Sequence, residues 1–239
     1  TPFIGGLLAD RILGYRRSIV MGGLMMASGY FLLSVHNNTS FYIALFLIIL
    51  GNGFFKPNIS TMVGQLYPKG DRKVDSAFTI FYMGINLGAF FSPLICGGLG
   101  DTGSIGDFKY GFLAACVGMI ISIISFELLK NKYLMGPDGN AIGMPVKTLD
   151  AKNLGIVIGS FVLIFFLLSF KNMFKSDVDL IGYLIYGAMI IVPLVIITDK
   201  SLTPEEKSRI AVIFILAFFV IFFWSAFEQA GASLTIFAD

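Results

Sequence analysis

The stretch Phe41-Tyr-Ile-Ala-Leu-Phe-Leu-Ile-Ile-Leu-Gly-Asn-Gly-Phe-Phe-Lys-Pro-Asn-Ile-Ser60 decides the fold class. It carries a single charged side chain, at Lys56. A helix of about 20 apolar residues, rising about 1.5 Å per residue, crosses the ~30 Å hydrocarbon layer of a bilayer. Backbone polar groups in lipid need partners within the chain, so this stretch predicts a membrane helix.

Apolar runs of similar length recur along the chain. Of its 239 residues, 56% are hydrophobic and 13% charged, and the mean hydropathy is +0.83. This composition excludes a soluble globular domain and a disordered chain. We expect an all-α, multi-pass membrane protein in which Thr1–Leu8 ends one helix. Seven further spans are predicted at Ser18–Val35, Phe41–Gln65, Phe78–Leu99, Phe112–Leu129, Leu154–Phe170, Leu180–Ile197 and Ile210–Leu234.

Lysine and arginine are distributed unevenly between alternate loops. One set of loops holds thirteen of them and the opposite set holds three. The basic loops should be cytoplasmic, so the last helix runs from inside to outside. The thirteen are Arg11, Arg16, Arg17, Lys69, Arg72, Lys73, Lys130, Lys132, Lys147, Lys152, Lys200, Lys207 and Arg209, and the three are Lys109, Lys171 and Lys175.

The long loop Met135–Ala151 predicts a seam, because five Gly and Pro residues interrupt it. We expect three segments, at residues 1–133, 134–200 and 201–239. The middle segment holds this loop and a hairpin of two helices without a charged residue in their apolar runs. We expect that hairpin to face lipid.

Two charged residues, Lys56 and Glu228, lie clearly inside predicted spans, away from their ends. A charge at the centre of a span costs about 2.5–3.5 kcal/mol on insertion scales, which makes each a candidate functional residue. Asn52 lies one turn before Lys56 on the same face, and Pro57 is expected to loosen the helix; together they favour a wet cavity over snorkelling of Lys56. Glu228, one turn after Trp224, could pair with a cation or bind a proton, and the two roles are compatible.

Two further groups of polar residues stand out. Tyr82 and Asn86 are four residues apart and share a helix face. Asn86 in mid-span must bond either a neighbouring helix or a solute, and the residues alone leave this open. Positive-inside orientation alone would explain the short basic loop that contains Asp10, Arg11, Arg16 and Arg17.

Four motifs, in this order, resemble the proton-dependent oligopeptide transporter family of the major facilitator superfamily. They are Gly-x-Leu-Ala-Asp-Arg-x-x-Gly-x-Arg-Arg, Gly-Asn-Gly-Phe-Phe-Lys-Pro-Asn-Ile-Ser, Phe-Tyr-x-x-Ile-Asn-x-Gly and Phe-Trp-x-x-Phe-Glu-Gln-x-Gly-x-Ser-Leu. They extend from Gly5 to Leu234, so the resemblance covers nearly the whole chain.

The resemblance implies the helical bundle of that superfamily, from the end of helix 2 to helix 7. Residues 1–133 would belong to the N-terminal half, 134–200 to a cytoplasmic loop and the inserted hairpin of bacterial members, and 201–239 to the C-terminal half. Helix 1, with its Glu-x-x-Glu-Arg motif, and helices 8 to 12 are expected outside the chain. The full-length protein would carry di- and tripeptides with protons across the cytoplasmic membrane by alternating access. Its partners would be peptide, protons and membrane lipid, with no cofactor.

The resemblance also implies roles for single residues. Lys56 matches a lysine that faces the peptide carboxylate, and Asn86 an asparagine that contacts the peptide backbone or amino end. Trp224 matches a pocket wall, and Glu228 an acid linked to proton coupling and the outer gate. Tyr82 and Asn52 complete the predicted substrate site. The cytoplasmic gate loop, which does not bind substrate, would comprise Asp10, Arg11, Arg16 and Arg17.

Other classes of protein fit the sequence less well. Gly98-Leu-Gly-Asp101 spells an intramembrane aspartyl protease motif, but Asp101 and Asp107 fall in an outer loop with no second intramembrane Asp. Without His-Glu-x-x-His, and with one His and two Cys, neither a metalloprotease nor a structural zinc site is expected. The net charge of +2 does not indicate nucleic acid.

Two alternatives stay open. A structural or lipid-scrambling membrane subunit would leave the polar groups of Lys56, Asn86 and Glu228 unexplained. A transporter of the same fold could instead carry another small nitrogenous or anionic solute.

Overall fold

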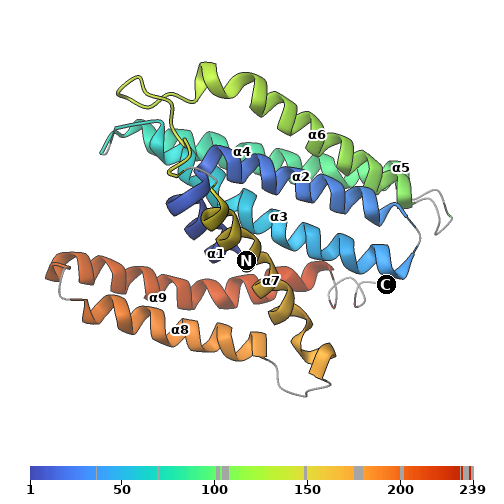
Figure 1. Ribbon diagram of the computed structural model, residues 1–239. Helices are drawn as coiled ribbons and strands as arrows, with labels where there is room; N and C mark the ends of the chain where they lie inside the picture. Colours follow the sequence, from blue (N-terminus) through green and yellow to red (C-terminus); the bar gives the residue numbers. More distant parts are fainter. Residues whose placement is uncertain are drawn as a thin grey trace. The chain divides into compact units, whose positions relative to one another are not determined.

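The computed structural model describes residues 1–35, 37–68, 70–100, 103, 108–147, 150–174, 180–199, 202–231, 233 and 237. In these ranges the chain is helical apart from turns and one isolated β-bridge between Met135 and Ala141 (Figure 1). The α-helices are α1 (Pro2–Leu8), α2 (Tyr15–Leu33), α3 (Asn38–Gln65), α4 (Lys73–Ser92), α5 (Gly98–Gly100), α6 (Phe108–Tyr133), α7 (Ala151–Phe174), α8 (Leu180–Thr198) and α9 (Pro204–Phe227). Shorter π- and 3₁₀-helical segments are η1 (Ala9–Leu13), η2 (Pro93–Gly97) and η4 (Glu228–Gly231).

Each of the seven predicted spans is mostly helical over its described residues. Four helical segments are long and apolar enough to cross a membrane: Asn38–Gln65, Lys73–Gly100, Phe108–Tyr133 and Pro204–Phe227. Shorter apolar stretches, Ala151–Leu167 and Gly182–Thr198, occupy α7 and α8. Helix α2 is less apolar because its 19 residues begin with Tyr-Arg-Arg and include Gly and Ser.

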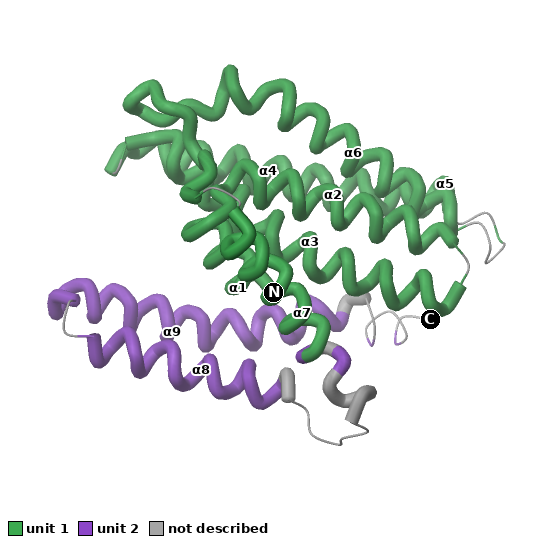
Figure 2. The backbone as a smooth tube through the Cα atoms, viewed as in Figure 1, with its two compact units in different colours: residues 1–166 green, residues 167–239 purple. Residues whose placement is uncertain are grey.

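The chain forms two compact units, Thr1–Phe166 and Leu167–Asp239 (Figure 2). Their boundary lies inside α7 and not in the loop Met135–Ala151, where the sequence predicts a seam. The three-segment division therefore stays a prediction. Residues His36, Lys69, Asp101, Asp107, Lys175 and Lys200 lie outside the described ranges.

In the first unit, α2 lies between α3 and α6, and α1 packs on α3 (Figure 1). The α2–α3 contact is close because glycine faces glycine. A Cβ atom on Gly22 would lie 2.6 Å from the Gly51 carbonyl oxygen, and one on Gly51 would lie 2.5 Å from that of Gly22. Small residues of this kind let two helix backbones touch, which is the usual packing mode in membranes.

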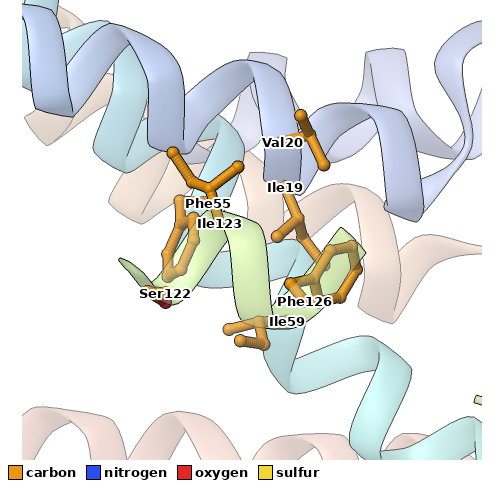
Figure 3. A pocket seen from close by; sticks show the side chains of 7 residues that line it. All are labelled: Ile19, Val20, Phe55, Ile59, Ser122, Ile123 and Phe126. Carbon is orange, nitrogen blue, oxygen red and sulfur yellow. The ribbon is translucent and has the colours of Figure 1, made fainter. Parts of the chain in front are cut away.

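Helices α2, α3 and α6 enclose a small cavity of about 30 Å³ (Figure 3). Apolar side chains dominate its lining, so the cavity belongs to the packing of the bundle. The lining residues are Ile19, Val20, Phe55, Ile59, Ser122, Ile123 and Phe126.

A buried cluster joins the first helices to α7. Phe54 of α3 is 1% exposed, and its ring meets Phe161 of α7 edge-on at 5.4 Å between centroids. Val157 and Ile164 of α7 are each 4% exposed. These three α7 residues recur at positions i, i+4 and i+7, so they form one helix face. The expectation that the hairpin faces lipid is therefore wrong for this face of α7, which packs against α3 inside the first unit.

Several helix ends differ from the predicted spans. Helix α3 continues without interruption through Pro57, where the sequence predicts a loosened backbone. The Asn58 side chain donates to the Phe54 carbonyl oxygen, one turn earlier in the same helix, at 2.7 Å. Helix α4 gives way at Pro93 to the π-helical turn η2, because proline's lack of an N–H disrupts the helical ladder.

The last helix also differs at both ends. It begins at Pro204, where the Thr203 side chain and Glu206 form a capping box. Its α-helical part ends at Phe227, and Glu228 begins a 3₁₀ turn that Gly231 completes. Glycine disfavours a continued α-helix, and 3₁₀ turns are common at helix C-termini. In the second unit α8 packs on α9.

Candidate functional site

Helix α3 carries its polar residues on two different faces. Lys56 and Asn52 are exposed, and their spacing of four residues puts them on one face. Asn58 is 1% exposed, and its Nδ2 donates to Phe54 and, at 3.5 Å, to the carbonyl oxygen of Gly5 in α1. Two residues correspond to about 200° around a helix, so Lys56 and Asn58 point apart. Asn58 therefore joins α3 to α1, whereas Asn52 lies beside Lys56 on the exposed face.

The ammonium group of Lys56 is uncompensated within the described residues. No carboxylate of the described residues lies within ion-pair distance of Lys56. The ion pair that these residues do form joins Glu127 and Lys130 at 2.6 Å. The neighbouring hydroxyls of Ser60 and Thr61 bond backbone carbonyl oxygens of α3 instead. A lysine on an apolar, membrane-length helix is costly unless water or an anion meets it.

Helix α4 presents the second predicted group. Tyr82 is 60% exposed, and Asn86 is exposed one turn later. The Nδ2 of Asn86 donates to the Tyr82 carbonyl oxygen at 3.0 Å. The sequence left a neighbouring helix or a solute as its partner, and the structure adds a third partner, its own helix. This bond uses a donor and leaves the Oδ1 of Asn86 without a partner among the described residues.

The third group lies at the end of α9, in the second unit. Trp224 and Glu228 line one surface hollow together with Val220, Ile221 and Ser225. The Trp224 ring meets Phe227 edge-on, with centroids 5.4 Å apart. The aromatic contact fixes one wall of the hollow, and the Glu228 carboxylate is exposed at its edge. The structure thus brings together the aromatic and the acidic residue that the sequence singled out here.

The predicted cytoplasmic gate loop is joined by a hydrogen bond to the start of α2. The Tyr15 hydroxyl donates to Asp10 Oδ1 at 2.7 Å. Burial, and then the Asp10 carboxylate, raise the pKa of Tyr15, which precedes the predicted span at Ser18. Arg11 and Arg17 are exposed. Asp10 is therefore bonded to the start of α2, and these two guanidinium groups remain accessible.

Arg16 behaves differently from its neighbours, and sequence reasoning missed its partners. It is 5% exposed and donates four hydrogen bonds to residues more than a hundred positions away. Three acceptors are backbone carbonyl oxygens, which leave no trace in a sequence. The acceptors are the carbonyl oxygens of Lys130, Leu134 and Ile142 and the side-chain oxygen of Asn131.

The predicted site residues fall on three separate helices. Lys56 with Asn52 lies on α3, Tyr82 with Asn86 on α4, and the pair Trp224 and Glu228 at the end of α9. Within the described part of the chain, no hydrogen bond joins the α3 pair to the α4 pair. Over the same ranges, no group of three or more His, Cys, Asp or Glu residues could hold a metal ion.

Several apolar helices of membrane-spanning length place the chain in the class of multi-pass membrane proteins. The chain belongs to the POT family, whose model, PTR2, matches residues 16–239. This is a transporter family and not a family of enzymes.

Named relatives agree with this family. The chain is 36% identical over its whole length to the "Uncharacterized transporter YclF" of Bacillus subtilis (strain 168), of which it covers 48%. It is 32% identical to the "Di-/tripeptide transporter" of Lactococcus lactis subsp. lactis (strain IL1403), again over its whole length and 49% of that protein. The chain thus spans about half the length of the curated relatives that it matches.

Solved structures confirm the fold. A crystal structure of a POT family transporter in complex with 5-aminolevulinic acid matches with a TM-score of 0.76 and 31% identity, over 99% of this chain and 49% of that one. A mutant of the peptide transporter POT in complex with alafosfalin matches with a TM-score of 0.72 and 33% identity, over 100% of this chain and 48% of that one. The predicted superfamily bundle is therefore confirmed for the part that this chain covers.

Proposed function

We propose that the full-length protein carries di- and tripeptides into the cell together with protons, by alternating access in the cytoplasmic membrane. Family membership and the relative named as a di-/tripeptide transporter support this proposal. The observation that carries it is the exposed Lys56, which has no ion-pair partner in the described part of the chain and lies beside Asn52 on a membrane-length helix. Protons are the coupling ion, and no cofactor is needed.

Lys56 is proposed to bind the carboxylate at the C-terminus of the peptide. An ammonium group attracts a carboxylate strongly where water is partly excluded, because the local dielectric constant is low. Asn52 lies on the same face and offers further hydrogen bonds. Asn86 is proposed to accept a hydrogen bond from the peptide through its Oδ1, with Tyr82 beside it.

Glu228 is proposed to bind the coupling proton, and Trp224 to form a wall of the pocket. A carboxylate holds a proton when its surroundings are dry and releases it when a cation or water approaches. A conformational change that alters access to Glu228 would therefore load and unload one proton per cycle. Asp10, Arg11, Arg16 and Arg17 are proposed to stabilise one state of the cytoplasmic gate.

A second candidate substrate is another small anionic nitrogen compound. A solved POT family transporter, 31% identical to this chain, holds 5-aminolevulinic acid. That compound combines an amino group with a carboxylate, as a dipeptide does. The same Lys56 would serve it, so the substrate must be decided by competition and not by the presence of this lysine.

The test measures exchange of labelled dialanine across liposomes that contain the full-length protein. Competitors are trialanine, 5-aminolevulinic acid and dialanine amide, which lacks the carboxylate. We expect wild-type protein to prefer dialanine over its amide by about 10- to 100-fold, the usual value of a charged hydrogen bond. In Lys56→Ala exchange should fall to background, and any residual binding should no longer distinguish the two.

The matched control is Lys132→Ala, at the exposed end of α6, which should retain both exchange and the preference. Normal exchange in a folded Lys56→Ala protein would remove Lys56 from the site. Folded wild-type protein that exchanges labelled 5-aminolevulinic acid but not labelled dialanine would replace the peptide assignment with the second candidate.

A further inference from the structure

The segment that links α6 to α7 is fastened to the gate loop. Residues Leu134–Lys147, here called the strap, form a short hairpin in which Ile142 N–H donates to Leu134 at 3.2 Å and Gly136 N–H to Asn140 at 2.8 Å. Gly139 lies in its turn with φ +76°, a conformation that glycine adopts readily. The strap is thus a folded element and not an extended tether.

Arg16 holds this hairpin at its open end. Its Nε donates to the Ile142 carbonyl oxygen at 2.7 Å, and one terminal nitrogen donates to that of Leu134, also at 2.7 Å. The same nitrogen donates to Lys130 at 3.1 Å, and the other to the Asn131 side chain at 2.9 Å. A guanidinium group has five donors in a fixed plane, and a lysine cannot reach acceptors so arranged.

The charge of Arg16 also suits its position. Lys130 lies in the last turn of α6, and Leu134 directly follows that helix. Besides Arg16, the Lys130 carbonyl oxygen accepts the Leu134 N–H at 3.1 Å, and the Leu134 carbonyl oxygen accepts the Ile142 N–H. The negative end of the helix dipole favours a cation at this end of α6. Arg16 therefore caps α6 and closes the hairpin with the same group.

The backbone makes a second, independent contact between strap and gate loop. Arg16 N–H donates to Gly143 at 3.0 Å, and Lys147 N–H donates to Ile12 at 3.2 Å. A Cβ atom on Gly14 would run into the Met144 carbonyl group. One on Gly143, which has φ +69°, would lie 3.2 Å from Tyr15 Cβ. The two chain segments touch too closely for larger residues at these glycines.

We propose that Arg16 is a positioning residue that makes the strap a fixed part of the cytoplasmic end of the first unit. In this arrangement Arg16 acts within the unit, whereas exposed Arg11 and Arg17 remain available to other parts of the gate. The strap then supports the gate loop from Ile12 to Arg16. The different roles of Arg16 and of Arg11 and Arg17 rest on the proposed function of the gate loop. The attachment of the strap by Arg16 does not rest on that function.

The fastening is tested by hydrogen exchange on the full-length protein in lipid nanodiscs. Wild-type amides of Ile142, Arg16 and Lys147 should be protected. In Arg16→Met their exchange should accelerate about 10-fold or more, because the hairpin loses its anchor. Arg17→Met is the matched control, since Arg17 is adjacent and exposed, and it should leave the strap unchanged.

Two further variants keep the test decisive if Arg16→Met fails to fold. Arg16→Lys keeps the charge, and Gly143→Ala disturbs the contact from the strap side. Both should accelerate exchange of the strap amides while protection within α3 stays at the wild-type level. Wild-type protection of the strap in a folded variant of Arg16 would overturn the proposal. So would unprotected strap amides in the wild-type protein.

An uptake assay separates positioning from substrate binding. Because Arg16 does not touch the peptide in this account, Arg16→Lys should lower the maximal rate of dialanine uptake without changing KM. A raised KM with an unchanged maximal rate would overturn the positioning role. If wild-type protein takes up no peptide, the proposed function fails, and the exchange experiment still decides whether Arg16 fastens the strap.

Discussion

Polar residues on α3 differ in whether they are exposed or packed against other helices. Lys56 and Asn58 are two positions apart in one motif, but one is exposed and the other is 1% exposed. The sequence contained the signal for this difference, because residues two apart on a helix point in nearly opposite directions. What it could not provide was the partner of Asn58, since the backbone carbonyl of Gly5 lies 53 positions away.

Replacing Asn58 should therefore affect stability more than replacing Asn52. Asn58→Ala removes two donated hydrogen bonds and leaves a buried gap, which should cost about 1–3 kcal/mol in the free energy of unfolding. Asn52→Ala removes an exposed side chain and should leave this free energy nearly unchanged. Thermal unfolding of the purified full-length protein compares the two. Equal unfolding midpoints for both variants would contradict the packing role of Asn58.

The strap contains a residue whose titration can be followed. The side-chain amide of Asn140, and then its backbone N–H, hold the pKa of the Asp138 carboxyl below its usual value. A lowered folded pKa means that the ionised group stabilises the turn above the usual Asp pKa of about 3.9. That contribution is lost as the pH falls through the lower folded value.

We expect Asn140→Ala to raise the pKa of Asp138 toward its usual value. The measurement is an NMR titration of labelled aspartate carboxyls, with Asp138→Asn to assign the signal. An Asp138 midpoint that is the same with and without the Asn140 side chain would show that the turn does not form as described.

Helices could be predicted from apolar runs, but their ends and contacts could not. The runs located each long helix of the described residues, because a membrane imposes length and polarity on a helix. The predicted start of α4 was five residues late, since Lys73–Ala77 is polar yet helical, with Asp71 accepting from the Lys73 N–H at 2.9 Å. The start of α9 carried a readable signal in its capping box, Thr203 and Glu206.

The contact between α2 and α3 gives a prediction at the level of helices. Gly22→Ala places a methyl group against the Gly51 carbonyl and should destabilise the protein by about 1–3 kcal/mol, the usual cost of overpacking. Gly118→Ala on α6 is the control, because a Cβ atom there meets nothing within 4 Å among the described residues. Thermal unfolding should separate the two variants. A Gly22→Ala protein as stable as the control would contradict this close packing.

For the molecule as a whole, the distribution of basic residues and the contacts of Arg16 both place the gate loop and the end of α6 on the same side of the membrane. The gate loop and the end of α6 both belong to the basic, predicted cytoplasmic set, and Arg16 bonds one to the other. Neutral carbonyl acceptors explain why the sequence did not reveal this link. The thirteen-to-three distribution over all loops stays a prediction.

The proposed activity also belongs to the whole protein, because this chain covers about half of its relatives. Lys56 on α3 and Glu228 after α9 lie in different units, and each is proposed to bind one of the two transported species. Symport requires that both act in one cycle. A test of the central claim must therefore use the full-length protein and measure peptide and proton together.

The most direct measurement is accumulation of labelled dialanine in sealed liposomes that contain this protein, under an inward proton gradient. The account predicts concentrative uptake that a protonophore abolishes. Glu228→Gln should lose accumulation but keep exchange of dialanine. Absence of uptake by demonstrably folded protein, or uptake that a protonophore leaves unchanged, would contradict proton-coupled peptide transport.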